Sequence, residues 1–235
     1  MNREEKEYHL RKQLSFLYNS GDTFEVCLIG SPITKHGLWE NKFANKIISG
    51  WFVDVDKAVN VVMEAEETVK PVGIYLTLNP CDEQMRAVSD ERLRPVKVRT
   101  ADKFISRIEN FFIDVDPIRP SGTSSSVNQL SFALEKVFEV REAFPEKENC
   151  MLALSGNGYH LIYKANGIGT ERIKKILNFA SEKFTDENVA VDTSVFNPAR
   201  LIKAYGTTAR KGEEVKSLYI EHRVAVIKEG CDGNI

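Results

Sequence analysis

Two aspartates spaced two residues apart, Asp114 and Asp116, lie in the apolar segment FFIDVDPIRP, residues 111–120. Successive side chains of a β-strand point to opposite faces, so these two carboxylates would share one face of a strand. Carboxylate oxygens suit hard cations such as Mg²⁺ or Mn²⁺. A two-metal site for phosphoryl transfer usually needs a third carboxylate from elsewhere in the chain. The segment is therefore a candidate metal platform, although such a pair can also simply cap a turn at Pro117.

A second pair with the same spacing, Asp54 and Asp56, lies in the segment WFVDVDK. Residues 57–67 after it form a plausible helix, which predicts Asp56 as the N-cap and Asp54 as a neighbouring turn residue. The later pair is followed instead by a polar loop, residues 117–126, that could lie open beside a ligand. We therefore interpret only the later pair as catalytic.

The segment LALSGNGYHLIY, residues 152–163, predicts a strand, a turn and a second strand. Its residues Gly156-Asn157-Gly158 readily adopt the positive φ angles that a tight hairpin needs. His160 follows the turn, where its ring could reach a phosphate group, and Ser155 precedes it. A lone histidine is, however, more often a structural residue, so this segment is informative only together with its neighbours.

The segment VDTSVFNPARLIKAYGTTARKG, residues 191–212, contains one acid, Asp192, which offers the missing third carboxylate. Arg200 could bind a triphosphate through its forked guanidinium group, and Lys203 could approach it as a point charge. Taken singly, each basic residue here could equally be a solvated surface charge. The four basic residues are Arg200, Lys203, Arg210 and Lys211.

In this order, the three segments resemble the archaeo-eukaryotic primase superfamily, in particular the primase-polymerases of phages, plasmids and other mobile elements. The strand with Asp114 and Asp116 resembles its motif I, and SGNGYH with His160 resembles motif II. Val191 and Asp192, followed by an NPAR-x-x-K-x-YGT stretch at residues 197–207, resemble motif III. The segment GIYLTLNP, residues 73–80, and the pair His222 and Arg223 are also similar to this subgroup. The resemblance covers most of the chain from about Phe24 onward.

The resemblance implies a template-directed nucleotidyltransferase, with DNA polymerase activity and primer synthesis, in the DNA replication of a mobile element or host. Two Mg²⁺ or Mn²⁺ ions would be held by Asp114, Asp116 and Asp192. His160 would be a further catalytic residue and would bind the nucleotide together with Ser155, Arg200 and Lys203. The weaker candidates for nucleic-acid contacts are Asn79, Arg119, Arg210 and Lys211.

The same resemblance implies partners: a DNA template and primer, dNTP or NTP substrates, and a helicase or a helical priming accessory domain, into which relatives often continue. The sequence departs from the family pattern at one position. Many relatives have serine two residues before the motif II histidine, where this chain has Gly158. A hydroxyl contact to phosphate at that position is therefore in doubt.

Two other classes of function stay open as alternatives. A rolling-circle initiator nuclease needs two histidines on one strand and a nucleophilic tyrosine, whereas His160 stands apart from His9, His36 and His222. A catalytically silent nucleic-acid-binding module of a replication protein would be expected to lose acids from the triad, and all three acids are present.

Composition sets broader limits. With 235 residues, of which 42% are hydrophobic, the chain can bury the core of one domain or of two joined lobes. No apolar run approaches the length of a membrane span and the N-terminal residues are charged, so we expect a cytoplasmic protein without a membrane partner. The net charge of -2 means that nucleic-acid binding would need a local basic patch. The candidates are Arg92, Arg94, Lys97 and Arg99, with Arg119, Arg210 and Lys211, although residues 92–99 could equally form a solvated loop. The cysteines lack CxxC spacing, which argues against a zinc site or a disulfide framework; they are Cys27, Cys81, Cys150 and Cys231.

The pattern of apolar residues predicts an α/β (α+β) fold. The family resemblance implies a single primase-polymerase domain of two lobes packed together. The first lobe, about residues 1–105, would hold a helix at 4–19, a strand at 24–30, the helix after Asp56 and a strand at 73–80. The second, about 106–235, would run strand, helix (127–144), hairpin, helix (171–184), strand, followed by a strand around 217–227. That order is ferredoxin-like, as in RNA-recognition motifs. The apolar stripes of the two helices are Leu130, Leu134, Val137 and Phe138, and Ile173, Ile176, Leu177, Ala180 and Phe184.

Overall fold

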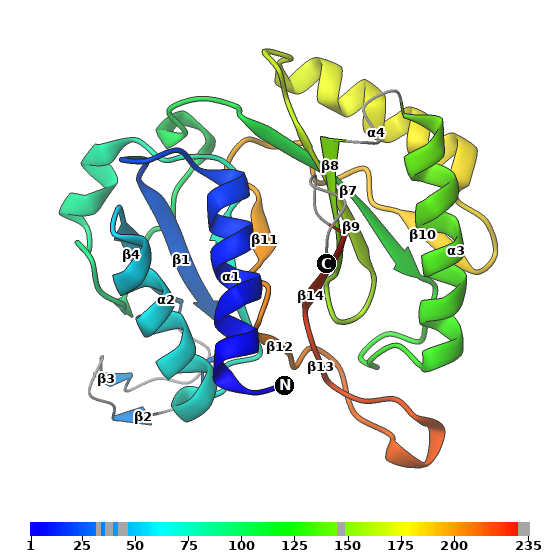
Figure 1. The fold of residues 1–235 in the computed structure, drawn as a ribbon, viewed down its shortest axis with the longest axis horizontal. Helices are drawn as coiled ribbons and strands as arrows, with labels where there is room; N and C mark the ends of the chain where they lie inside the picture. Colours follow the sequence, from blue (N-terminus) through cyan, green and yellow to red (C-terminus); the bar gives the residue numbers. More distant parts are fainter. Residues whose placement is uncertain (32–33, 36–39, 42–46, 145–148, 230–235) are drawn as a thin grey trace. The chain divides into compact units, whose positions relative to one another are not determined.

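The computed structural model describes residues 1–31, 34–35, 40–41, 47–144 and 149–229, so statements about His36 and Cys231 fall outside the described residues. It divides into two compact units. Unit 1 consists of Met1–Ile108 with Pro198–Thr208, and unit 2 of Glu109–Asn197 with Ala209–Ile235. Within the described residues, no helix has both the length and the apolar character needed to cross a membrane. The chain is a mixed α+β protein built on antiparallel sheets (Figure 1).

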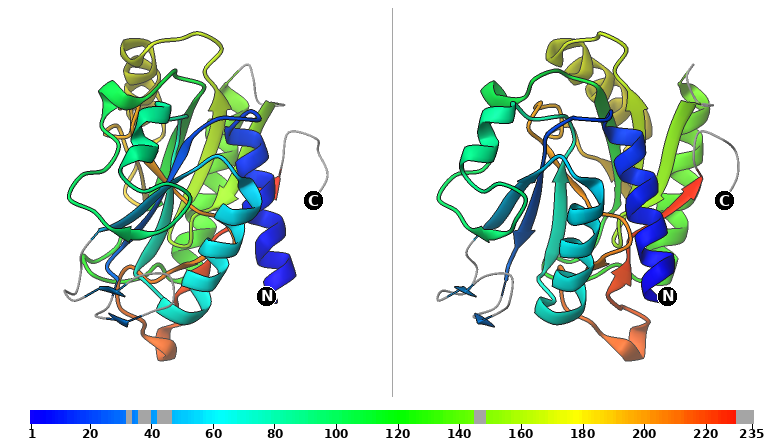
Figure 2. Two further views of the ribbon diagram at one scale, coloured as in Figure 1. Left: turned by 90° about the vertical axis from the view of Figure 1, so that its left-hand side faces the viewer. Right: turned by 60° about the vertical axis from the view of Figure 1, so that its left-hand side comes forward.

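Unit 1 contains a five-stranded sheet in the order β11-β5-β1-β4-β6, in which each neighbouring pair is antiparallel. Figure 2 shows helices α1 and α2 side by side within this unit. The strands are β1 (Phe24–Ile29), β4 (Ile48–Phe52), β5 (Gly73–Thr77), β6 (Arg94–Pro95) and β11 (Leu201–Lys203), with a small pair of strands, β2 (Thr34–Lys35) and β3 (Glu40–Asn41). The helices are α1 (Arg3–Leu17) and α2 (Val55–Glu64), the latter continued by a π turn over Ala65–Val69, with short 3₁₀ turns at Glu83–Ala87 and Asp102–Phe104.

The two faces of the unit 1 sheet bury different kinds of side chain. On the face toward α1, Phe24 stacks on Tyr18 at the end of the helix, with ring centroids 4.6 Å apart. The alternate residue of β1, Glu25, points to the other face, where its buried carboxylate accepts hydrogen bonds from the Ser49 hydroxyl at 2.6 Å and the Thr100 N–H at 3.0 Å. A buried charge is tolerated when it is hydrogen-bonded in this way.

Helix α2 begins two residues earlier than the sequence predicted. Asp54, not Asp56, is the N-cap, and its carboxylate accepts the N–H groups of Asp56 and Lys57 at 2.9 and 3.1 Å. Asp56 lies inside the first turn and forms an exposed ion pair with Arg11 at 2.6 Å. The prediction of Asp56 as the cap was wrong because Asp54, two residues earlier, already accepts the free N–H groups at the start of the helix.

The segment Pro198–Thr208 belongs to unit 1, although the expected lobe boundary near residue 105 grouped it with the second lobe. Gln13 of α1 holds it: the side-chain amide donates to the Lys203 carbonyl at 2.9 Å and accepts the Tyr205 N–H at 2.8 Å. Gln13 is fully buried, so both of its polar atoms depend on this segment.

Unit 2 has the order β7-α3-β8-β9-α4-β10, and its sheet runs β10-β7-β9-β8-β14. All neighbouring strands are antiparallel. Its first four strands have the arrangement predicted for the ferredoxin-like lobe, and β14 extends the sheet at the β8 edge. Their bounds are β7 (Asn110–Pro117), α3 (Val127–Ala143), β8 (Cys150–Leu154), β9 (Tyr159–Lys164), α4 (Thr170–Phe184), β10 (Val189–Val191) and β14 (Val226–Glu229). The expected strand at 217–227 is instead a 3₁₀ turn at Lys216–Leu218, β13 (Arg223–Val224) and the start of β14, while β12 (Thr208–Ala209) is a further short strand.

Helices α3 and α4 lie over one face of this sheet (Figure 1). The buried stripe of α3 is Leu130, Ala133, Val137 and Val140. Of the predicted members, Leu134 is only half-buried and Phe138 is 40% exposed. Consecutive residues are about 100° apart around a helix, so a stripe that continues through Val140 turns Phe138 away. The stripe of α4 is as predicted, except that Ile176 is only half-buried.

Candidate active site

The predicted acids of unit 2 meet on the face of the sheet that the helices leave uncovered. Phe111 of β7 is on the helix side, where it stacks on Tyr163, which in turn contacts Phe144. Asp114 and Asp116 alternate with the residues on that side and therefore point to the opposite face.

Strand register brings His160 and Asp192 to the same place. Asp114 of β7 is directly opposite His160 of β9. On the other side of β7, Val191 of β10 is opposite Val115, and the next N–H, that of Asp192, donates to the Asp114 carbonyl at 3.0 Å. Residues directly opposite in antiparallel strands point to the same face. The face therefore carries a row of Asp192, Asp114 and His160, with Asp116 two residues along β7.

Each of the three acids also has a different partner. Oδ1 of Asp114 lies 3.5 Å from Nε2 of His160. Oδ1 of Asp116 lies 3.8 Å from the guanidinium group of Arg119, and Oδ1 of Asp192 accepts the Ser194 N–H at 2.7 Å. The three carboxylates thus share a face but have separate contacts.

The His160 ring is fixed by its surroundings. It is 5% exposed, and its centroid lies 4.9 Å from that of Phe112, with the two rings tilted by 59°. Phe112 precedes Asp114 by two residues on the same face of β7. The ring is thereby positioned to orient the Asp114 carboxylate.

The hairpin turn before His160 is closed by its own hydrogen bonds. The Ser155 hydroxyl donates to the Gly158 carbonyl at 3.0 Å and accepts the Gly158 N–H at 3.1 Å. A β-carbon at position 158 would overlap Oδ1 of Asp116 and lie 2.7 Å from the Val115 carbonyl oxygen. Gly158 thus leaves room for the second acid, a role that sequence reasoning missed. The signal was the glycine itself, at a position where many proteins of the superfamily that the sequence resembles have serine.

Positive charge surrounds Asp116. The Arg119 guanidinium group donates to the carbonyl oxygens of Thr123 and Pro117, both at 3.2 Å, which holds it in the loop after β7. Lys211 is exposed, and its carbonyl accepts the side-chain amide of Asn157 at 3.2 Å, next to the hairpin turn. The neighbouring Arg210 is half-buried.

The electrostatic surroundings of Asp116 raise the pKa of its carboxyl group. Burial of its carboxylate raises the pKa, Arg119 and Lys211 lower it, and the nearby Asp192 carboxylate raises it, with a net pKa above the usual value. A cation bound beside Asp116 would offset both unfavourable effects.

The other predicted site residues, Asn79, Arg200 and Lys203, belong to unit 1. Lys203 is 4% exposed, and its ammonium group donates to the Ile74 carbonyl at 3.4 Å, the Thr208 carbonyl at 3.2 Å and the Thr207 hydroxyl. The buried Asn79 amide donates to the Pro198 carbonyl at 3.1 Å. Arg200 is half-buried, and its carbonyl accepts the Leu78 N–H at 2.7 Å. In unit 1 these contacts hold the segment Pro198–Thr208, to which the chain returns after unit 2, in place. The ligand contacts predicted for the three residues stay predictions.

The three acids have the chemistry that Mg²⁺ or Mn²⁺ requires, because they offer carboxylate oxygens on one face of a sheet. In the part of the chain that the structure describes, no group of three His, Cys, Asp or Glu side chains could hold a metal ion as it stands. Each acid has its own neighbour instead: His160 lies beside Asp114, Arg119 lies beside Asp116, and the Ser194 N–H binds Asp192. The chemistry of the donors fits the metal, but their present arrangement does not place three of them around one ion.

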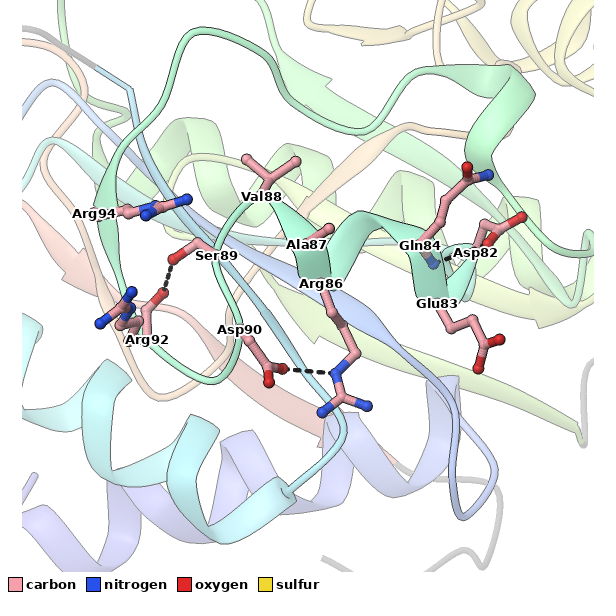
Figure 3. Close-up of a pocket in the computed structure, with 10 residues that line it drawn as sticks. All are labelled: Asp82, Glu83, Gln84, Arg86, Ala87, Val88, Ser89, Asp90, Arg92 and Arg94. Atoms are coloured by element: carbon pink, nitrogen blue, oxygen red, sulfur yellow. Dashed lines mark hydrogen bonds and ion pairs between the residues drawn. The ribbon is translucent and has the colours of Figure 1, made fainter.

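Unit 1 has an open surface pocket of about 760 Å³ next to the 3₁₀ turn Glu83–Ala87 (Figure 3). Arg86 is paired with Asp90 at 2.6 Å, and the Ser89 hydroxyl donates to the Arg92 carbonyl at 2.7 Å. The lining carries both signs of charge: Asp82, Glu83 and Asp90 with Arg86, Arg92 and Arg94. Asp114, Asp116 and Asp192 are not among the lining residues.

No protein-family model matches the sequence, and no curated protein matches it. Among solved structures, the chain is similar to one described as the crystal structure of primase RepB′, with a TM-score of 0.49 and 12% sequence identity. The match covers 96% of this chain and 57% of that chain, so the present chain spans little more than half the length of that primase. Function therefore has to be argued from the site itself.

Proposed function

We propose that this chain is a metal-dependent nucleotidyltransferase of the primase-polymerase type, which extends a strand along a DNA template. The observation that carries the proposal is the row of Asp192, Asp114 and His160, with Asp116 beside it, on the face of a ferredoxin-like sheet opposite its two helices. These residues come from three separate segments of the sequence. A ferredoxin-like sheet alone would not indicate an activity, because the fold hosts many functions.

Asp114, Asp116 and Asp192 would hold the two Mg²⁺ or Mn²⁺ ions. When bound, the ions would lower the pKa of an attacking 3′-hydroxyl and neutralise charge on the leaving group. The hydroxyl oxygen forms a bond to the α-phosphorus of the nucleotide, the bond between that phosphorus and the bridging oxygen breaks, and pyrophosphate leaves with the electron pair. The hydroxyl proton passes to water, so no protein base is required.

The chain's own residues would orient the reactants. His160 holds Asp114 in place from the neighbouring strand, and Arg119 and Lys211 provide positive charge beside Asp116 for phosphate oxygens. The family resemblance adds Ser155, Arg200 and Lys203 as contacts to the triphosphate, and Asn79 and Arg210 as contacts to nucleic acid. For Lys203 this role would require phosphate oxygens to replace its present three partners.

The biological setting is also part of the proposal. We propose that the chain acts in DNA replication in the cytoplasm, on a template and primer with dNTP or NTP substrates, and works with a helicase or a helical priming accessory domain. Initiation on a nucleotide would give primer synthesis, and initiation on a primer end would give DNA polymerase activity.

The test is primer extension and primer-free synthesis, measured side by side with labelled nucleotides and Mg²⁺ or Mn²⁺. We expect metal-dependent products from the wild type and a loss of at least about a hundredfold for Asp114→Asn/Asp116→Asn. The matched control is Asp54→Asn/Asp56→Asn, which changes the other pair of the same spacing and should retain activity, since asparagine also caps helices well. Equal activity in wild type and the Asp114/Asp116 variant would contradict the proposal.

The second candidate function is nucleic-acid binding without catalysis. Two observations favour it. Among the described residues no group of three His, Cys, Asp or Glu side chains could hold a metal ion, and Asp114 and Asp116 lie beside His160 and Arg119. Template binding without metal-dependent product would support this alternative.

A further inference from the structure

Unit 2 contains a second pocket, of about 610 Å³, on the helix-covered side of its sheet. It lies where the end of α3 and the first turns of α4 meet the start of β7 and the end of β9. The lining residues are Phe111, Ala143, Phe144, Tyr163, Lys164, Ala165, Asn166, Ile168, Arg172, Lys175, Ile176 and Phe179. None of the acids of the candidate active site is among them.

The inner wall of this pocket is aromatic. Phe111 stacks on Tyr163 with centroids 5.4 Å apart, and Phe144 contacts Tyr163 at 5.8 Å and Phe179 at 6.4 Å. Phe179 is nevertheless 49% exposed. Aromatic rings that are grouped around a cavity and remain partly exposed are typical of a surface that binds an apolar group.

Among the described residues that line the pocket, all the charged side chains have one sign. They are Lys164, Arg172 and Lys175, and none of the described lining residues is Asp or Glu. The chain as a whole has 34 acidic and 32 basic residues, so this is a local departure. Lys164 donates to the Asn110 side chain at 3.0 Å. Arg172 and Lys175 are exposed, and among the described residues no ion pair engages either side chain.

Tyr163 contributes its ring to this aromatic wall. It is 2% exposed, and its hydroxyl is buried beside the Cys150 thiol.

The position of the pocket indicates a partner rather than a substrate. Phe111 lines the pocket and points to the helix side, whereas Asp114 and Asp116 point to the other face of the same strand. A nucleotide bound at the acids therefore has the sheet between it and the pocket. We propose that this pocket docks an acidic peptide segment of a partner protein, with an apolar side chain among the aromatic rings and carboxylates on Arg172 and Lys175.

Fluorescence anisotropy on the full chain tests this, with fluorescein-labelled eight-residue peptides that carry four aspartates and one Phe, Leu or Ile. We expect at least one peptide to bind, and its affinity to fall about tenfold for Arg172→Glu/Lys175→Glu and for Phe179→Ala. Binding should also weaken with added salt. The matched control, Lys174→Glu, changes the adjacent residue, whose ammonium group lies over Phe196, and should bind as the wild type does.

Three results would overturn the inference: no binding of any of the peptides, equal binding of a peptide with the anchor replaced by serine, or displacement of the peptide by oligo(dT) or ATP. The last result would assign the pocket to nucleic acid instead. The inference does not rest on the proposed polymerase, because peptide binding is measured without nucleotides. Primer extension by Arg172→Glu/Lys175→Glu, measured in parallel, should equal that of the wild type.

Discussion

Gly158 and Asp116 compete for the same space in unit 2. Any side chain at position 158 would displace the Asp116 carboxylate or the Val115 carbonyl of β7, because a β-carbon there overlaps Oδ1 of Asp116. The serine that many proteins of the resembled superfamily have at this position would therefore need a different path of the hairpin. In this chain the hydroxyl next to the turn is that of Ser155, and it is used to close the turn.

The variant Gly158→Ser should lose about 1–3 kcal/mol of unfolding free energy, because the added atoms overpack the turn against β7. Its primer extension should fall more than its stability, since Asp116 is the group displaced. The matched control is Gly169→Ser at the N-cap of α4, where no atom lies within 4 Å of an added β-carbon and serine is a favoured cap. Urea unfolding and primer extension measure both effects, and equal behaviour of the two variants would contradict this account.

The raised pKa of Asp116 predicts a pH dependence of stability. A carboxyl whose pKa is raised in the folded state stabilises the fold below its unfolded pKa, about 3.9, and this contribution is lost as the pH rises through the folded value. At pH 7 the ionised Asp116 therefore destabilises the fold. Asp116→Asn should raise the Tm at pH 7 by about 1–2 °C, and the difference should shrink toward pH 4.

The matched control is an aspartate whose pKa is lowered in the folded state, so its substitution should change the Tm in the opposite direction. The Asn188 N–H and Lys136 lower the pKa of Asp186, so its contribution is present above the unfolded pKa and is lost as the pH falls through the lowered value. Asp186→Asn should therefore lower the Tm at pH 7. Differential scanning calorimetry from pH 4 to pH 7 checks both variants, and a lower Tm for Asp116→Asn at pH 7 would argue against the assigned cause.

At the scale of the element, the start of α2 depends on which aspartate caps it. Asp54→Ala removes hydrogen bonds to two N–H groups and should cost about 1 kcal/mol of unfolding free energy. Asp56→Ala removes only an ion pair whose carboxylate is 76% exposed, and should cost less than about 0.5 kcal/mol. Chemical denaturation compares the two, and a larger effect for Asp56→Ala would restore the cap predicted from the sequence.

Other helices and strands were predicted correctly where the pattern of apolar residues extends over many residues. Strand β7, helix α3 and helix α4 were predicted within a few residues, because long apolar patterns define them. Strand β4 was not predicted. Its five residues are all buried, so they show no alternation, and their pairing with β1 is what makes them a strand.

At the scale of the whole molecule, the chain leaves unit 1 after Ile108 and returns to it at Pro198. Strand β11 adds to the edge of the unit 1 sheet through β5, and the buried Gln13 amide needs its partners in Lys203 and Tyr205. A division of the gene near residue 105 would therefore leave the first unit incomplete.

A fragment of residues 1–108 should be poorly folded, and a synthetic peptide of residues 198–208 should raise its Tm by binding at β5, because the peptide pairs an open sheet edge and satisfies Gln13. Circular dichroism with increasing peptide measures the effect. A scrambled peptide is the control. A fragment that is equally stable with and without the peptide would contradict this role of the returning segment.

The sequence by itself determined the local features of this protein. The spacing in Asp114-Val-Asp116 requires a shared face once the segment is a strand, the glycines before His160 require a turn, and the long periodic stretches require helices, because each depends only on neighbours in the chain. The tertiary structure alone decided which residues far apart in the sequence lie close together. Strand register placed Asp192 and His160 on either side of Asp114, β-sheet pairing assigned Lys203 to unit 1, and packing gave Gly158 its role beside Asp116. These relations join residues far apart in the sequence, and local composition carries no information on their distance.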